Sequence, residues 1–423
     1  SGGIAGYVNN VITKISLSSI QGFTISGTSL NIGGVAGYNS SNSYIVSRKV
    51  KNSNTLSGVD RIGGIASVNY GTIYDCTFSG NIQSINSSNA GYFGGLVGIN
   101  YSNLTDSISY AEISVANNSS ASGIFYFVGG LCGYNVGNIT NCSVYADEFS
   151  AKQSTGVVYL AGLTAYNSGI LKYCLADVLN IGSVNSNIYT AGLAVFNYGG
   201  NIFGCFHFGN LNGYQVVGLV RTNTNNGIID SCMSGLNDTE RAIYKGAQLA
   251  SFVYDISSGT ISNCIVNADL NCTSENGWIA GFAGFMPLTN SKFGTISHSI
   301  ANVSFNGVGT KYLDIAQDGL MKKKRTTGTI SNCVISSDAN IEDVMLSEYS
   351  KFFWITQNPG SESNYIIANA TELTDIDFYL NPTTCNFDIS VGISTSKWLY
   401  INDTRLPLPR TFLEVFGYDI IGF

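Results

Sequence analysis

The chain has 423 residues, of which 11% are charged and 44% are hydrophobic, and it contains 49 glycines but only 5 prolines. A coiled coil or helical bundle is excluded because it would need far more alanine, glutamate, lysine and leucine. The net charge of −7 disfavours a nucleic-acid partner, and no apolar run reaches the roughly 18 residues of a membrane-spanning helix.

A glycine-rich motif recurs along the first 340 residues, and its two halves recur together. The clearest copies of the first half are Gly34–Asn39, Gly64–Asn69, Gly95–Asn100, Gly130–Asn135, Gly162–Asn167 and Gly192–Asn197. The run from Gly137 to Cys142 is typical of the second half. With degenerate copies counted, eleven copies follow one another at intervals of about 31 residues. Because the chain opens inside this pattern at Gly3, we expect a processed chain or a fragment of a longer protein.

This repeat predicts a stack of coils. Short β-prone runs separated by glycine and asparagine are typical of strands and tight turns. A unit of this length cannot bury an apolar face alone, but a stack of copies can. We therefore predict an all-β parallel β-helix, or β-solenoid, of about eleven coils of about 31 residues over residues 1–340. A β-propeller is the less suitable alternative, because its blades need ~40–50 residues.

The two halves of the repeat, as in Gly130–Asn135 and Gly137–Cys142, resemble the GLUG motif, which runs Gly-Gly-Leu-Val-Gly-x-Asn-x-Gly-x-Ile-x-Asn-Cys. The similarity covers about residues 1–340. It implies a surface or secreted repeat protein of the kind found in bacteria and protists, often adhesin-like. It implies no catalytic residues.

Most of the cysteines occupy one position of the repeat. They are Cys76, Cys142, Cys174, Cys205, Cys232, Cys264 and Cys333. Stacking places them in one column, where we expect small, buried, free thiols. Disulfides between neighbouring coils are the alternative, since the spacing of coils lies within the allowed range. The paired spacings of a metal site are missing, so we expect neither a metal nor a cofactor.

The residue before each column cysteine is predicted to lie at a corner, where Asn141 can adopt a left-handed conformation. Asp75 and Asp106 occupy this position in adjacent coils. We expect two solvated acids. The alternatives are a shared proton, a Ca²⁺ site, or an acid pair that cleaves polysaccharide. His207 and His298 are solitary, and we expect each to fill a repeat position rather than act as a catalytic base.

Aromatic residues recur after the glycine motif, at Tyr38, Tyr134, Tyr166 and Phe196. If this column faces outward, it forms a surface suited to sugar rings or a partner protein. If it faces inward, it is a stack within the core, which we consider the better interpretation. Periodicity alone does not give the direction.

Two further features concern the surface. The basic run from Lys322 to Arg325 is expected to be a solvated loop, with a contact for an acidic partner as the alternative. Asn117, Asn118 and Asn237 lie in Asn-x-Ser/Thr sequons within predicted loops, which makes them the candidate glycosylation sites of a secreted protein.

The period stops near residue 340. Residues 341–423 hold four of the five prolines and many of the acids, and they are predicted to form a C-terminal cap of mixed structure. Such a cap would cover the open strand edges of the last coil. The N-terminal edge has no comparable cap, so we expect protein partners or copies of the same chain to dock there.

Together these features favour a non-enzymatic structural or adhesion protein at the cell surface or outside the cell. It would act as a rigid β-solenoid rod, with a filament or surface array as one form of assembly. The alternative is a carbohydrate-binding or carbohydrate-active β-helix that uses Asp75, Asp106 and the aromatic column. Glycans are therefore a second class of expected partner.

Overall fold

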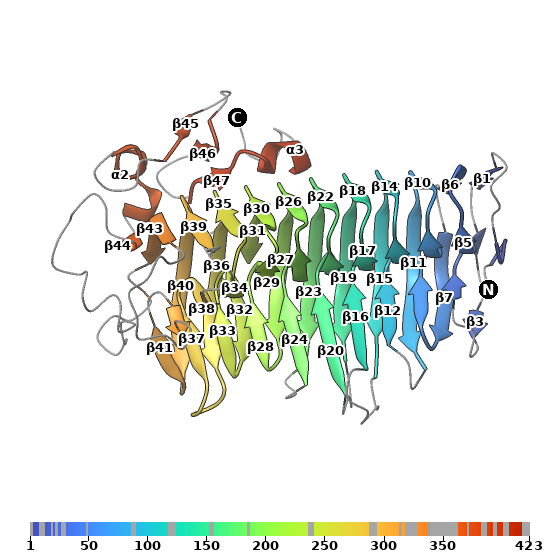
Figure 1. Cartoon of the computed structure of the whole chain (residues 1–423), viewed down its shortest axis with the longest axis horizontal. Coiled ribbons are helices and arrows are strands. Elements are labelled where there is room, and N and C mark those ends of the chain that lie inside the picture. The colour runs from blue at the N-terminus through green and yellow to red at the C-terminus, as the bar shows by residue number, and fades with distance from the viewer. Residues whose placement is uncertain are drawn as a thin grey trace. The chain divides into compact units, whose positions relative to one another are not determined.

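The protein is described by a computed structural model of the chain (Figure 1). The described residues are 3–7, 13–17, 20–21, 24–26, 31–47, 50–85, 90–116, 124–151, 156–183, 187–235, 241–286, 294–312, 315–317, 329–336, 338, 363–369, 372–381, 387–391, 396–400 and 406–416. The basic run Lys322–Arg325 and the sequon residues Asn117, Asn118 and Asn237 lie outside these ranges.

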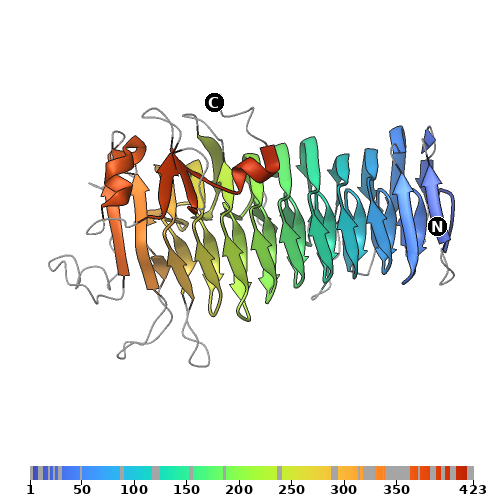
Figure 2. The same cartoon turned by 90° about the horizontal axis from the view of Figure 1, so that it is seen from above.

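The chain divides into two compact units. The first comprises Ser1–Phe196 and Asn212–Tyr214, and the second comprises Asn197–Leu211 and Gln215–Phe423. In each unit the strands pair in parallel with the equivalent strands of the next coil, as Figures 1 and 2 show. The predicted all-β parallel β-solenoid is therefore confirmed. Each coil has three walls, which we name the glycine wall, the asparagine wall and the long wall.

The glycine wall contains the strands that precede the central glycines of the repeat. In the first unit these strands are β4 (Asn31–Gly33), β8 (Arg61–Gly63), β12 (Gly91–Gly94), β16 (Phe125–Gly129), β20 (Val157–Ala161) and β24 (Ile188–Ala191). In the second unit they are β28 (Gln215–Val217), β33 (Gln248–Ala250), β37 (Trp278–Ala280) and β41 (Thr310–Tyr312). This wall contains ten described strands, so the number of coils differs slightly from the eleven predicted.

The asparagine wall contains the strands that follow those glycines. Its strands are β5 (Ala36–Asn39), β9 (Ala66–Asn69), β13 (Val97–Asn100), β17 (Cys132–Asn135), β21 (Thr164–Asn167), β25 (Ala194–Tyr198), β29 (Val220–Thr224), β34 (Val253–Ile256), β38 (Ala283–Phe285) and β42 (Ile315–Gln317). The register matches the repeat, because Asn69 pairs with Asn100 and Asn100 pairs with Asn135. The sequence period therefore fixes which side chains lie above one another.

The long wall bends at a corner, so most coils contribute a short strand and a long one. In the first unit its strands are β1 (Thr13–Leu17), β2 (Ile20–Gln21), β3 (Thr24–Ser26), β6 (Ser43–Ser47), β7 (Val50–Gly58), β10 (Thr72–Tyr74), β11 (Thr77–Ser84), β14 (Asn103–Thr105), β15 (Ile108–Ser114), β18 (Asn138–Thr140), β19 (Ser143–Ser150), β22 (Ile170–Lys172) and β23 (Leu175–Gly182). The remaining strands are β26 (Asn201–Phe203), β27 (Phe206–Asn212), β30 (Ile228–Asp230), β31 (Met233–Gly235), β32 (Ala242–Gly246), β35 (Thr260–Ser262), β36 (Ile265–Cys272), β39 (Thr295–Ser297), β40 (Ile300–Gly307), β43 (Thr329–Ser336) and β44 (Ser363–Ala368).

The corner of the long wall is made by left-handed residues. Asp75, Asp106 and Asn141 have φ of 50°, 50° and 53°. Asn263 and Asn332 repeat this conformation in the second unit, with φ of 53° and 51°. Asparagine and aspartate tolerate this region better than other side chains because they form local hydrogen bonds. The left-handed corner predicted at Asn141 is confirmed.

The asparagines of the glycine-rich motif form a buried ladder. Asn39, Asn69, Asn100, Asn135 and Asn167 are each fully buried. Each Nδ2 donates to the Oδ1 of the next asparagine along this run, over 2.7–2.9 Å. Several of the same amides also donate to a nearby backbone carbonyl, as Asn100 does to Ser102 over 2.8 Å. The ladder satisfies backbone oxygens at the end of the asparagine wall, where a buried unpaired carbonyl would be costly.

The C-terminal segment packs on the second unit. Strand β44 pairs in parallel with β43 and so adds one strand to the long wall at that end. The rest contains η3 (Glu372–Thr374), α2 (Ile376–Leu380), β45 (Ile389–Val391), β46 (Trp398–Tyr400), β47 (Leu408–Pro409) and α3 (Phe412–Phe416). This part lies beside the corners of the coils (Figure 1), where Thr411 Oγ1 donates to the Ser231 carbonyl over 2.7 Å. These described parts of the C-terminal segment therefore brace the side of their own unit.

The glycine and asparagine walls approach closely at Gly133. A Cβ there would lie 2.7 Å from the backbone nitrogen of Phe93 and 2.9 Å from the carbonyl oxygen of Phe127. Both atoms belong to the backbone and cannot move aside as a flexible side chain would, so we expect Gly133→Ala to lower the free energy of unfolding by about 1–3 kcal/mol. Gly6→Ala is the matched control, because Gly6 has the same repeat position and open space within 4 Å. Equal urea midpoints for both variants would contradict this.

Candidate functional site

The predicted aromatic column lies on the asparagine wall. Tyr38, Tyr134, Tyr166 and Phe196 are each partly exposed, and each precedes a fully buried asparagine. Successive side chains of a strand point to opposite faces, so these rings lie on the face opposite the buried ladder. The interpretation favoured from the sequence, an inward stack, is therefore wrong. The rings are half-buried because aromatic side chains of the glycine wall pack against them, as Tyr92 packs edge-on against Tyr134 over 5.7 Å.

The rings stack on one another in two groups within the first unit. The first group, which we call the N-terminal ladder, comprises Tyr7, Tyr38, Tyr70 and Tyr101, with ring centroids 4.5–5.3 Å apart. The second group, which we call the central cluster, comprises Tyr92, Phe127, Tyr134, Tyr159, Tyr166, Tyr189 and Phe196. In the central cluster, Tyr134 and Tyr166 are 4.3 Å apart and 5° from parallel.

Sequence reasoning missed more than half of these rings. Tyr92, Phe127, Tyr159 and Tyr189 each lie three residues before the first glycine of a motif copy (Gly95, Gly130, Gly162 and Gly192), a regular spacing that marks them as one column. Tyr70 and Tyr101 each follow a motif asparagine directly. Each pattern identifies its own set of the additional rings, and Tyr7 is found separately because it has the repeat position of Tyr38.

Stacking determines what this surface offers. The broad faces of rings such as Tyr134 and Tyr166 cover each other, so the edges and hydroxyl groups are what remain for solvent or a ligand. Burial, together with the neighbouring Tyr166, raises the pKa of Tyr134 to about 12. Burial also raises the pKa of Tyr38, Tyr70 and Tyr92. These phenols stay neutral near pH 7 and can donate and accept hydrogen bonds.

The two predicted acids lie on another wall. Asp75 lies between β10 and β11, and Asp106 lies between β14 and β15, both at the corner of the long wall. Asp106 is exposed and accepts a hydrogen bond from Asn141 Nδ2 over 3.2 Å. Because the aromatic column belongs to the asparagine wall, the structure does not unite the two halves of the predicted sugar site. Within the described ranges, no group of three or more His, Cys, Asp or Glu side chains is arranged to hold a metal ion.

The cysteine column is buried, and its members form no disulfide bonds. Its members, Cys76, Cys142, Cys174, Cys205, Cys232, Cys264 and Cys333, are fully buried free thiols. Each Sγ donates to the carbonyl oxygen two residues earlier, over 3.0–3.5 Å. Ser107 makes the same contact over 2.7 Å. The column therefore satisfies the carbonyl next to the left-handed corner, which explains why a serine can replace a cysteine. Cys132 and Cys272 are also buried and free.

Both histidines have structural partners. His207 is fully buried, and its Nδ1 lies 3.0 Å from Ser234 Oγ, which in turn lies 2.6 Å from the Tyr244 hydroxyl. Burial lowers the pKa of His207 to about 3. His298 occupies a left-handed corner, and its Nε2 lies 3.1 Å from Asn332 Nδ2. Since His207 has no exposed surface, it has no access to a substrate in solution.

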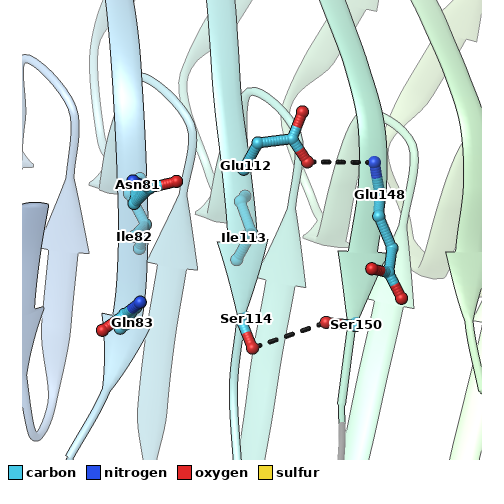
Figure 3. Close-up of a pocket in the computed structure, with 8 residues that line it drawn as sticks. All are labelled: Asn81, Ile82, Gln83, Glu112, Ile113, Ser114, Glu148 and Ser150. Atoms are coloured by element: carbon cyan, nitrogen blue, oxygen red, sulfur yellow. Dashed lines mark hydrogen bonds between the residues drawn. The ribbon is translucent and has the colours of Figure 1, made fainter. Parts of the chain in front are cut away.

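A shallow polar hollow of about 120 Å³ lies on the long wall of the first unit (Figure 3). It is lined by Asn81, Ile82, Gln83, Glu112, Ile113, Ser114, Glu148 and Ser150. The register of β15 with β19 shifts between Ser109 and Ile113, and β19 carries one extra residue there. The Glu112 carboxylate accepts hydrogen bonds from the backbone nitrogens of Asp147 and Glu148, over 2.9 and 3.0 Å. The hollow is therefore a β-bulge whose free amides are satisfied by Glu112.

Comparisons with known proteins find no match that would assign the chain to a family. No protein-family model matches the chain, and neither a curated protein nor a solved structure matches it. In the part of the chain that the structure describes, no helix is long and apolar enough to cross a membrane.

Proposed function

We propose that this protein is a non-enzymatic structural or adhesion module that acts at the cell surface or outside the cell. Its function is to hold a regular β-solenoid as a stiff spacer, as a single rod or as a subunit of a filament or array. The extracellular location rests on the resemblance of the repeat to the GLUG motif. Glycans on Asn117, Asn118 or Asn237 are part of the same proposal.

The observation that supports this proposal is that the polar side chains that could act in catalysis or ligand binding instead form hydrogen bonds between adjacent coils. The buried asparagines bond to one another, Glu112 holds a bulge of the next strand, and Asp106 binds Asn141. Polar groups used in this way stiffen a repeat and are not free to act on a substrate. The use of these groups in hydrogen bonds between coils therefore favours a structural rather than a catalytic role.

The test is electron microscopy of untagged native material. Filaments or ordered arrays are expected if the protein is an assembly subunit, and the N-terminal edge is then the first contact to map. Single stiff particles that bind cells or matrix would support the adhesion module. Material that is flexible along its length would overturn the proposed spacer.

A carbohydrate-binding protein is the second candidate, because the rings of the central cluster are partly exposed. Sugar rings pack on the faces of aromatic side chains, and stacking covers the faces of Tyr134 and Tyr166. We therefore expect no binding on a glycan array at micromolar protein concentrations. Binding that is lost in Tyr134→Ala and kept in Tyr44→Ala would establish this candidate and displace the first one, since Tyr44 is an exposed tyrosine on the long wall.

A further inference from the structure

Tyr70 and Tyr101 form an exposed parallel pair of phenols in adjacent coils. Their ring centroids are 4.5 Å apart and their planes differ by 10°. Tyr70 is 39% exposed and Tyr101 is 40% exposed, so a reagent in solution can reach both rings. This combination of stacking and access is what sets the pair apart from the central cluster, whose rings are only partly exposed.

The backbone holds this pair in register. The Tyr70 nitrogen donates to the Asn39 carbonyl over 2.7 Å, and the Tyr101 nitrogen donates to the Asn69 carbonyl over 2.8 Å. Each tyrosine directly follows an asparagine of the buried asparagine ladder. These two asparagines are linked, because Asn69 Nδ2 donates to Asn100 Oδ1 over 2.7 Å. These backbone hydrogen bonds fix the two side chains relative to each other in addition to the stacking of the rings, so the rings meet repeatedly in the same geometry.

We propose that Tyr70 and Tyr101 are a site of oxidative cross-linking, at which a dityrosine bond joins two adjacent coils. A haem peroxidase with hydrogen peroxide takes one electron and one proton from each phenol, and the peroxide is reduced to two water molecules. The two phenoxyl radicals then share their unpaired electrons in one new carbon–carbon bond, between the ring carbons next to the hydroxyl groups. Each of these carbons loses its hydrogen as a proton, each phenoxyl oxygen gains one, and two phenols are restored.

The parallel geometry favours this bond. The new bond forms along the π lobes, which are perpendicular to the ring planes, so stacked rings point these lobes at each other. Tyr92 and Tyr134 meet edge-on at 87°, which directs the lobes apart. Tyr110 and Tyr145 lie 5.6 Å apart with planes 23° from parallel, a longer and more tilted arrangement. We therefore expect Tyr70 and Tyr101 to couple before either of these pairs.

The experiment treats the folded chain with a haem peroxidase and hydrogen peroxide at low protein concentration. Cleavage before aspartate separates the two tyrosines, since Asp75 lies between them in the sequence. Mass spectrometry is expected to find the two peptides joined and lighter by two hydrogen atoms. The yield is expected to fall by about tenfold or more in guanidinium chloride, because unfolding removes the fixed register.

Matched variants make the result decisive. Tyr70→Phe keeps the stacked ring but has no phenol, so the joined peptide is expected to disappear. Tyr44→Phe removes another exposed tyrosine, 46% exposed, and is expected to leave the yield unchanged. A joined peptide that persists in Tyr70→Phe would overturn the proposal. So would a folded chain that forms dityrosine only between molecules, or not at all while free tyrosine in the same mixture couples.

Discussion

Replacing Asn100 by alanine is expected to lower the free energy of unfolding by about 3–4 kcal/mol, because it interrupts the buried asparagine ladder. Asn100 Oδ1 accepts from Asn69, and Asn100 Nδ2 donates to Asn135 and to the Ser102 carbonyl. All three asparagines are fully buried, so water cannot replace the lost partners. The stability is measured by urea denaturation followed by circular dichroism of the β structure.

Asn103→Ala is the matched control for this variant. Asn103 lies three residues further along the same coil and is exposed, and its side-chain Oδ1 accepts a hydrogen bond from Asn138 Nδ2 on the surface. Since water can replace that bond, we expect a change within about 0.5 kcal/mol. If the two variants had equal denaturation midpoints, the ladder would contribute no more to stability than an ordinary surface amide, which would contradict this prediction.

Acid is expected to destabilise this protein through His207. The pKa of His207 is lowered by burial to about 3, whereas an unfolded histidine has a model value of 6.5. The unfolded chain therefore binds a proton that the folded chain does not bind between these values. The contribution of His207 to the free energy of unfolding is complete above pH 6.5 and falls as the pH drops towards 3. At pH 4 the loss is about 3 kcal/mol, at 1.36 kcal/mol for each pKa unit.

The measurement compares urea unfolding at pH 7 and pH 4 in the protein and in His207→Leu. We expect the variant to lose about 3 kcal/mol less between these pH values. Burial raises the pKa of Asp177 and Asp255, which gives a pH effect of the opposite sign in both proteins. The difference between the two proteins therefore isolates His207. His298→Asn places at this corner the residue found at other corners, and it is expected to change the pH dependence of the free energy of unfolding less than His207→Leu does. A pH dependence in His207→Leu equal to that of the unchanged protein would refute this prediction.

Much of the fold could be predicted from the sequence because the repeat constrains it twice. The period of about 31 residues sets the coil length. The residue types then fix the local geometry, as Asn141 at a left-handed corner illustrates. The cysteine column was also predictable, since a small side chain such as Cys142 or Ser107 recurs at one position next to that corner.

The candidate surface was less predictable. Tyr38 and Asn39 are neighbours in one strand, so one of them must face the core and the other must face away. Hydrophobicity favours burial of the tyrosine, yet the structure buries the asparagine, because its side-chain amide donates to the amide oxygen of Asn69 in the next coil and so continues along the column. A single copy of the repeat gives no sign of this, since the partner is contributed by the next coil.

The repeat alone predicts the coil length, the parallel strands, the corner residues and the register in which equivalent side chains stack. All of these follow from local conformational preference and from repetition at a fixed interval. The folded chain was needed to establish the direction of the aromatic column, the partners of Tyr92 on the facing wall, and the separation of Asp75 and Asp106 from the aromatic rings. These features depend on how walls from different parts of one coil pack together, whereas periodicity relates only equivalent positions in successive coils.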